Sequence, residues 1–345
     1  MGLLRAADRL SELSRRFERF VAKALSRQYS VRPGDAYGCD FLISAPTASG
    51  PAVVEAKFQR SVWASNSTMR NAFARLQAAR EKANAVAAIL ITNTAHDLLL
   101  RQEAESYGII VFDAEVLAAI ISSDGSLREE FENLQREALL SPPKNYDPIA
   151  DLPSLFEHPP EAAVSLPKVT TGEALWERIN AITPGREGAR KYEQRCEEAL
   201  RYLFEGDLTA WRSQKPTDQL HRFDLIARVS SRNDFWNCLR DRFGGQYIIF
   251  EFKNYSSRIG QAEIFTTEKY LFPKALRTVA LLLSRKGGDD HAQAAARGAL
   301  RESGKVILNL SDDELRSMLL LKDLGEEPSN ILLGLLDEML MSIER

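Results

Sequence analysis

The chain has few cysteines and no long apolar run. Its 345 residues include three cysteines, Cys39, Cys196 and Cys238, and no two of them have Cys-x-x-Cys spacing. This pattern argues against a disulfide framework and a structural zinc site, and it is typical of a reducing compartment. No apolar run reaches the roughly 18 residues that span a bilayer, and the first residues mix charges with leucines instead of forming a signal peptide. We therefore expect a cytoplasmic protein without a membrane segment.

The sequence also lacks an excess of positive charge. It has 45 Lys and Arg against 48 Asp and Glu, a net charge of -3. Dedicated nucleic-acid-binding proteins are usually basic, because neutralising phosphates supplies much of their affinity. Local basic stretches such as Arg70, Arg75 and Arg80 can still form a positive rim, although a solvated helix face is the more common explanation of such a pattern. The four histidines have no spacing suited to a metal or a nucleophile pair.

What the sequence does contain is an internal repeat. Each half has a helical stretch that opens with an aromatic residue and Glu, FERFVAKAL from Phe17 and YEQRCEEAL from Tyr192. A short strand that carries an Asp follows, and then an apolar strand that ends in Glu-x-Lys, AVVEAKF in one half and YIIFEFK in the other. Both halves continue with alternating helices and strands in the same order. This order predicts two tandem α/β sandwiches, each a mixed central sheet with helices on its faces.

A proline-rich stretch separates the two halves. Seven prolines lie between Ser141 and Thr171, too many for a regular element. We predict a first domain over residues 1–122, a helix and Pro-rich connector over 123–184, and a second domain over 185–345. The second domain ends in a very apolar helix, NILLGLLDEMLMSI. We expect this helix to dock on its own domain, the alternative being a homodimer or effector-partner interface.

The Glu-x-Lys strands carry the candidate catalytic residues. Side chains two apart in a strand share a face, so Glu55 lies beside Lys57. With Asp40 on the neighbouring strand, Glu55 would offer the hard oxygen ligands that magnesium prefers. A bound cation lowers the pKa of a coordinated water, and a nearby lysine can orient that water, assist its deprotonation or stabilise developing charge. The second copy repeats the arrangement with Asp224, Glu251 and Lys253.

These motifs resemble the PD-(D/E)xK superfamily of restriction-endonuclease-like nucleases, in particular its Mrr-like branch. The resemblance covers about 10–121 and about 185–320. It implies that the Asp and the Glu bind Mg²⁺, or Mn²⁺, that the Lys acts on the attacking water, and that a Glu of the first helix completes the site. The residues that it assigns are Glu18, Asp40, Glu55 and Lys57 in the first copy, and Glu193, Asp224, Glu251 and Lys253 in the second.

The two copies differ in detail. Neither Asp follows a proline, since Cys39 and Phe223 stand there. The second copy has 26 residues between its Asp and its Glu against 14 in the first, which predicts an inserted excursion over 233–245. Gln261 resembles a helix glutamine that many Mrr-like nucleases carry after the motif, whereas the first copy has Ser65 at that position. This difference favours the second copy as the active one.

The resemblance and the paired motifs together predict a magnesium-dependent endonuclease that hydrolyses duplex DNA, with a restriction or anti-phage role by analogy. One alternative is a non-catalytic nucleic-acid-binding or scaffold protein built from degenerate nuclease domains, in which each Glu and Lys form a strand-end ion pair. Another is an RNA nuclease or junction resolvase, which the sequence does not separate from a DNA nuclease.

Overall fold

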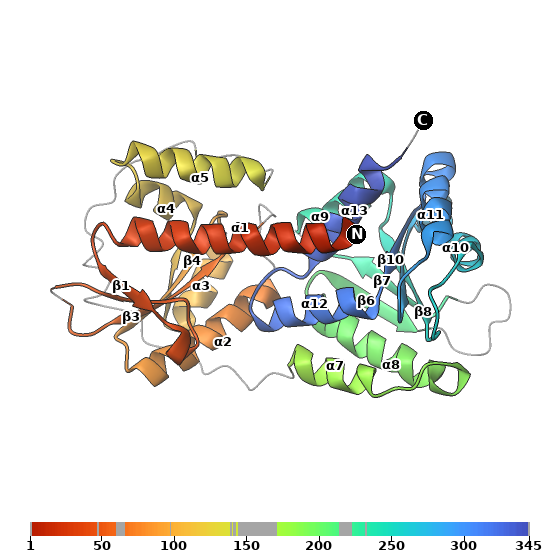
Figure 1. The fold of residues 1–345 in the computed structure, drawn as a ribbon, viewed down its shortest axis with the longest axis horizontal. Coiled ribbons are helices and arrows are strands. Elements are labelled where there is room, and N and C mark those ends of the chain that lie inside the picture. Colours follow the sequence, from red (N-terminus) through yellow and green to blue (C-terminus); the bar gives the residue numbers. More distant parts are fainter. Residues whose placement is uncertain are drawn as a thin grey trace. The chain divides into compact units, whose positions relative to one another are not determined.

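The protein is described by a computed structural model (Figure 1). It describes residues 2–46, 48–59, 66–96, 98–138, 140, 143, 171–213, 223–231 and 233–343. Most of the predicted Pro-rich connector, and Ser65, lie outside the described residues. The chain divides into two compact units, which are described separately. The N-terminal unit comprises Asp8–Val169 and Leu324–Glu326, and the C-terminal unit comprises Met1–Ala7, Thr170–Asp323 and Glu327–Arg345.

The N-terminal unit contains a five-stranded mixed sheet in the order β1-β2-β3-β4-β5. The antiparallel pairs are β1 with β2 and β2 with β3, and the parallel pairs are β3 with β4 and β4 with β5. The strands are β1 (Ser30–Pro33), β2 (Phe41–Ser44), β3 (Ala52–Lys57), β4 (Ala87–Thr92) and β5 (Ile109–Phe112). The mixed sheet agrees with the prediction.

Helices cover both faces of this sheet because its central strands are apolar on both sides. On one face α1 (Gly2–Leu25), α4 (Ala114–Ile120) and α5 (Gly125–Glu137) pack against Val54 and Ala56. On the other face α2 (Asn66–Ala83) and α3 (Leu98–Ser106) pack against Val53 and Leu90. A short 3-10 helix, η1 (Asp35–Tyr37), precedes β2. Glu55 and Lys57 alternate with Val54 and Ala56, so they share the face that α2 covers.

The C-terminal unit contains a sheet of the same design, in the order β10-β9-β8-β7-β6. Here β6, β7 and β8 are antiparallel, and β8, β9 and β10 are parallel. The strands are β6 (Leu208–Ser213), β7 (Leu225–Val229), β8 (Tyr247–Lys253), β9 (Val279–Ser284) and β10 (Val306–Leu310). Each strand therefore matches the strand five places earlier, and the structure has two five-stranded mixed sheets.

The helices of the C-terminal unit include one that the N-terminal unit lacks among its described residues. This helix is α9 (Asp234–Phe243), and it occupies the predicted excursion between β7 and β8. The Asn233 side chain accepts a hydrogen bond from the Phe235 N–H at its start, and Gly244 ends it with φ of 71°. The other elements are α7 (Gly172–Asn180), α8 (Arg186–Leu203), α10 (Gln261–Glu268), η2 (Pro273–Ala275), α11 (Asp290–Ser303), α12 (Asp312–Asp323) and α13 (Ser329–Met341).

The apolar C-terminal helix, α13, docks on its own unit. Leu332, Leu336 and Met339 are buried in the core of that unit, as expected for a helix with this many large apolar residues. A homodimer or partner interface through α13 stays a prediction. Among the described residues, no helix is both long enough and apolar enough to cross a bilayer.

Residues 123–184, predicted as a separate helix and connector, supply a helix to each unit. Phe131 of α5 lies in the core of the N-terminal unit and stacks on Phe20 at 5.3 Å between ring centroids. Leu175 and Ile179 of α7 lie in the core of the C-terminal unit. Both helices are amphipathic, so each buries its apolar face on the nearest sheet sandwich.

Candidate active sites

The first candidate site lies at the carboxyl end of β3. Glu55 and Lys57 are 0% and 4% exposed, and the Lys57 Nζ lies 2.7 Å from the Glu55 Oε1. Asp40 directly precedes β2, where its N–H donates to the Val54 carbonyl at 3.1 Å. The Ala56 N–H, between Glu55 and Lys57, donates to the Asp40 Oδ2 at 2.7 Å. The structure therefore brings together the Asp, Glu and Lys predicted for the first copy.

An arginine that sequence reasoning did not assign to the site also reaches it. The Arg75 Nη2, on α2, lies 3.3 Å from the Glu55 Oε1. Of the three arginines that could form a positive rim on this helix, Arg70 pairs with Glu103 at 2.5 Å and Arg80 donates to the Val86 carbonyl at 2.9 Å. Because five residues turn an α-helix by about 140°, the three arginines leave α2 in different directions, and each contacts a different group.

Two further glutamates surround Lys57. The Glu326 Oε1, in the short Leu324–Glu326 segment of the N-terminal unit, lies 3.3 Å from the Lys57 Nζ. No motif marks Glu326, because it is far along the chain from Lys57. Glu18 is half-buried on α1. Burial raises the pKa of Glu18, and the nearby charges of Glu326 and Glu55 add to the rise while Lys57 opposes it.

The first site concentrates negative charge in a buried place. Burial, and then the charge of Glu55, raise the pKa of Asp40 to about 6. Burial alone would lower the pKa of Lys57, but the carboxylates of Glu326, Glu55 and Asp40 raise it above its usual value. Among the described residues, the Glu55 Oε2 is buried without a hydrogen-bond donor. A buried acceptor without a donor fits a metal cation, which would also offset the excess charge.

The second candidate site repeats two of these connections, the Lys–Glu pair and the backbone hydrogen bond to the Asp. The Lys253 Nζ donates to the Glu251 Oε2 at 2.9 Å. Asp224 directly precedes β7, and the Phe252 N–H donates to its Oδ2 at 2.9 Å, as the Ala56 N–H does to Asp40. The Asp224 N–H in turn donates to the Glu251 Oε1 at 3.2 Å. The antiparallel pairing of β7 with β8 holds the Asp beside the Glu in this site, as β2 and β3 do in the first.

The second site is more open than the first. The Lys253 side chain is 20% exposed against 5% for Lys57. Burial, and then the charge of Asp224, raise the pKa of Glu251 to about 7. The pKa of Lys253 is also raised, because the charges of Glu251 and Asp224 outweigh its burial. The ammonium is therefore retained at neutral pH, within reach of solvent.

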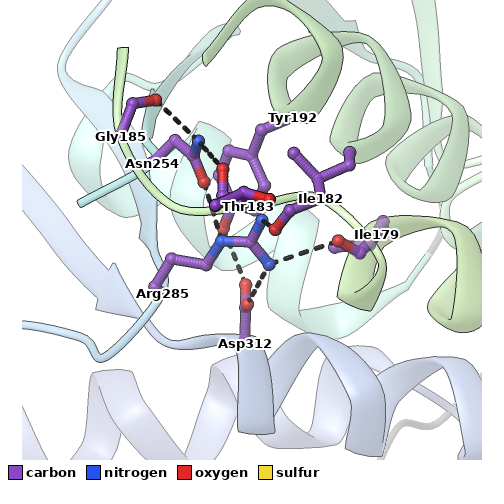
Figure 2. A network of polar contacts seen from close by, with 8 residues as sticks. All are labelled: Ile179, Ile182, Thr183, Gly185, Tyr192, Asn254, Arg285 and Asp312. Carbon is purple, nitrogen blue, oxygen red and sulfur yellow. Dashed lines mark hydrogen bonds and ion pairs between the residues drawn. The ribbon is translucent and has the colours of Figure 1, made fainter. Parts of the chain in front are cut away.

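A polar network braces the chain just beyond Lys253 (Figure 2). The next residue, Asn254, donates from its Nδ2 to the carbonyls of Thr183 at 3.0 Å and Gly185 at 2.9 Å, and its Oδ1 accepts from the Arg285 Nε at 2.8 Å. These bonds tie the end of β8 to the loop between α7 and α8. They therefore restrict the position of Lys253 relative to α8.

Arg285 is the centre of this network. Its guanidinium donates to the Ile182 carbonyl at 2.6 Å and pairs with the Asp312 Oδ2 at 2.9 Å. The Asp312 Oδ1 accepts from the Tyr192 hydroxyl at 2.7 Å, and the Arg285 guanidinium lies 4.3 Å from the centroid of the Tyr192 ring. Sequence reasoning missed these residues, because the only local signal is an Asn directly after Glu-x-Lys.

The remaining predicted residues, Glu193 and Gln261, lie on the helices expected of them. Glu193 is half-buried on α8, and Gln261 is the exposed first residue of α10. Their roles stay predictions. In the part of the chain that the structure describes, no group of three or more His, Cys, Asp or Glu is arranged to hold a metal. Each site instead joins one Asp to one Glu, the number of carboxylates with which proteins commonly hold magnesium alongside water and substrate phosphate.

Comparison with known proteins gives two findings. The family model Mrr_cat, described as a restriction endonuclease, matches residues 10–121. This match contains the first site and supports the PD-(D/E)xK superfamily for the N-terminal unit. The chain is also 30% identical over 93 residues, 27% of its length, to the "Putative transposon gamma-delta 80.3 kDa protein" of Escherichia coli (strain K12). The matched part is 13% of that protein, so the chain spans a small fraction of the relative's length.

Proposed function

We propose that the chain is a metal-dependent endonuclease that hydrolyses DNA phosphodiester bonds, and that its C-terminal site is the one that cuts. The observation that carries the proposal is the repeated geometry. In both units a backbone N–H from the residue between Glu and Lys holds the Asp oxygen, at 2.7 Å in one site and 2.9 Å in the other. The family match to residues 10–121 supports the chemistry for the first unit, and the shared strand order extends it to the second.

The proposed cation is Mg²⁺ or Mn²⁺. Asp224 and Glu251 would hold it in the C-terminal unit, and Asp40 and Glu55 in the N-terminal unit. When bound, such a cation supplies charge neutralisation for the phosphate and a more acidic water. The raised pKa of Glu251, about 7, supports this assignment, because two carboxylates that share a buried site oppose each other's ionisation until a cation is present.

Lys253 acts in this proposal through its protonated form. Since the carboxylates raise its pKa, the Nζ keeps its proton at neutral pH and serves as a donor instead of a base. Its bond to the Glu251 Oε2 fixes that carboxylate. Its remaining N–H groups are available to orient the attacking water or to stabilise charge on the phosphate oxygens.

The choice of the C-terminal site rests on access. Lys57 is nearly inaccessible and is paired with both Glu55 and Glu326, whereas Lys253 pairs with Glu251 and is partly exposed. A phosphate therefore reaches Lys253 with less rearrangement. Gln261, on the helix after the motif, adds an amide at the position where the first copy has Ser65.

The test is a cleavage assay on linear, circular and single-stranded DNA and on RNA, with Mg²⁺ or Mn²⁺. We expect Lys253→Met to lower the rate on DNA by about 10²-fold or more, and Lys57→Met to leave most of it. Lys305→Met is the matched control, because Lys305 pairs with Glu268 at 3.1 Å elsewhere in the C-terminal unit. Cleavage of RNA alone would instead support the RNA nuclease, and equal activity of Lys253→Met and wild type would refute the assignment.

A non-catalytic role of the N-terminal unit is the second candidate. The burial and the double pairing of Lys57 favour it, since a strand-end ion pair of this kind serves packing without any reaction. DNA binding that is unchanged by a chelator and by Asp40→Ala combined with Asp224→Ala would support a binding or scaffold protein.

We propose restriction of foreign DNA in the cytoplasm as the biological role, on the strength of the family description alone.

A further inference from the structure

The C-terminal unit contains a cavity of about 300 Å³ outside the Asp-Glu-Lys site. It lies between α11, the edge strand β10 and α13, and Arg258 lines it from the loop after β8. Its volume is at the lower end of the range for small-molecule sites. The walls combine the apolar Leu335 and Met339 with charged and amide side chains.

One of these amides is buried and has no partner among the described residues. Asn309, on β10, is 7% exposed, and both its Oδ1 and its Nδ2 are buried without a hydrogen bond to any residue that the structure describes. Burying an amide without partners is unfavourable, and such a group calls for an explanation such as a bound water, ion or ligand. Asn309 lines the cavity and its amide lies beside Gly288, another lining residue, so a turn of the side chain would present its donor and acceptor to a ligand there.

A glycine keeps the approach to this amide open. A Cβ added at Gly288 would lie 2.9 Å from the Ala292 Cβ and 3.3 Å from the Asn309 Cγ. Real Cβ atoms essentially never come within 3.0 Å of another heavy atom, so a side chain at Gly288 would force its neighbours to move. Gly288 itself lines the cavity. The cavity therefore depends on the absence of a side chain beside the unpaired amide.

Two arginines also line the cavity. Arg258 and Arg297 line it, and neither forms an ion pair with the described residues. Arg297 is on α11, and Arg258 is exposed at the rim. Arginine presents its donors in a planar fork that matches phosphate. Asp290 and Glu338, also in the lining, offer acceptors for hydroxyl groups.

The cavity is related to the Asp-Glu-Lys site by the register of the sheet. Glu251 pairs with Leu282, which pairs with Asn309, so the three side chains share one face on neighbouring parallel strands. Since adjacent strands lie about 4.8 Å apart, the backbones of Glu251 and Asn309 are about 10 Å apart. A nucleotide next to the scissile phosphate spans a comparable distance.

We propose that this cavity binds a nucleotide. The base lies against Leu335 and Met339 with its edge on the Asn309 amide, and the phosphate lies against Arg297 and Arg258. An inorganic anion would leave the Asn309 Oδ1 without a donor, and an apolar ligand would leave both the amide and the arginines unpaired. Because an asparagine amide pairs with both N6 and N7 of adenine, adenine is the favoured base. The nucleotide is either free in solution or part of a bound DNA strand.

The first arm of the test titrates the full-length protein with AMP, GMP, CMP, UMP, adenosine and ribose 5-phosphate by calorimetry. We expect AMP to bind most tightly. Asn309→Leu and Arg297→Ala should each weaken AMP binding about tenfold or more. Arg301→Ala, on the same helix and paired with Glu302 at 3.2 Å, should leave it unchanged.

The second arm measures binding of an adenine-containing DNA oligonucleotide to the same variants. If AMP does not bind but Asn309→Leu and Arg297→Ala weaken oligonucleotide binding, the nucleotide belongs to the DNA strand. If AMP binds and the oligonucleotide is unaffected, it is a free ligand. If neither measurement changes in Asn309→Leu or in Arg297→Ala, with circular dichroism showing both folded, the proposal is refuted. AMP binding needs no cleavage, so this test is independent of the proposed nuclease activity.

Discussion

Replacing Glu251 by Gln removes a carboxyl group whose pKa burial and Asp224 raise from 4.5 to about 7. Below pH 4.5 this group is protonated in both the folded and the unfolded chain. As the pH rises from 4.5 to about 7, the unfolded chain releases the proton while the folded chain keeps it. The free energy of unfolding therefore falls over this window, by about 3 kcal/mol for the full difference in pKa. In Glu251→Gln this loss should be absent.

The assay is urea unfolding at pH 5 and pH 8, followed by tryptophan fluorescence. Trp176, Trp211 and Trp236 all belong to the C-terminal unit, so replacing Trp63 with Phe makes the signal specific to that unit. We expect wild type to lose about 2–3 kcal/mol more than Glu251→Gln between the two pH values. Burial and Glu327 also raise the pKa of Asp207 to about 7, but this contribution is common to both proteins and cancels.

Two further measurements complete this experiment. Glu302→Gln is the control, since its side chain is 74% exposed and it should behave as wild type. Equal losses in wild type and Glu251→Gln would show that Glu251 ionises normally and that the buried, charged site is described wrongly. At pH 8, Mg²⁺ at 100 times its dissociation constant should stabilise wild type by about 2.7 kcal/mol and Glu251→Gln much less. A metal effect of equal size in both would place the cation elsewhere.

Three other substitutions test the fold around the sites, with stability measured by the same urea assay. Arg285→Lys should destabilise the C-terminal unit by about 2 kcal/mol, because lysine cannot reproduce the planar fork that joins Asn254, Asp312 and the Ile182 carbonyl. It should also slow cleavage as Lys253→Met does. Unchanged cleavage would show that the network does not position the site. Phe250→Ala should destabilise by about 3–5 kcal/mol, since Phe250 is fully buried and stacks on Trp211 at 5.6 Å. Phe265→Ala, at a position 50% exposed, is its control and should have little effect. Asn309→Leu should stabilise the ligand-free protein by about 1–3 kcal/mol by removing an unpaired buried amide, whereas Asn233→Leu should destabilise by about 1 kcal/mol by removing the α9 cap. A loss of stability in Asn309→Leu would mean that the amide has partners in solution.

The sequence by itself determined the features that follow from local periodicity. Alternation in a strand puts Glu55 with Lys57 on one face, and the same rule holds for Glu251 and Lys253. The order of apolar segments predicted two mixed sheets with helices on their faces. The extra residues between Asp224 and Glu251 predicted an insertion, which the structure identifies as α9. Each of these inferences uses neighbours within a few residues or a repeated order of elements.

Only the tertiary structure decided what surrounds each lysine. Arg75 and Glu326 reach the first site from a helix face and a distant segment, and nothing local to them signals Glu55 or Lys57. The hydrogen bond between Asn254 and Arg285 likewise joins residues far apart in the chain, and nothing near either residue signals the other. Burial, which raises the pKa values of Asp40 and Glu251, is also set by packing between elements. The physical reason is that a sequence pattern specifies which face a side chain occupies, whereas desolvation and charge depend on which other segments cover that face.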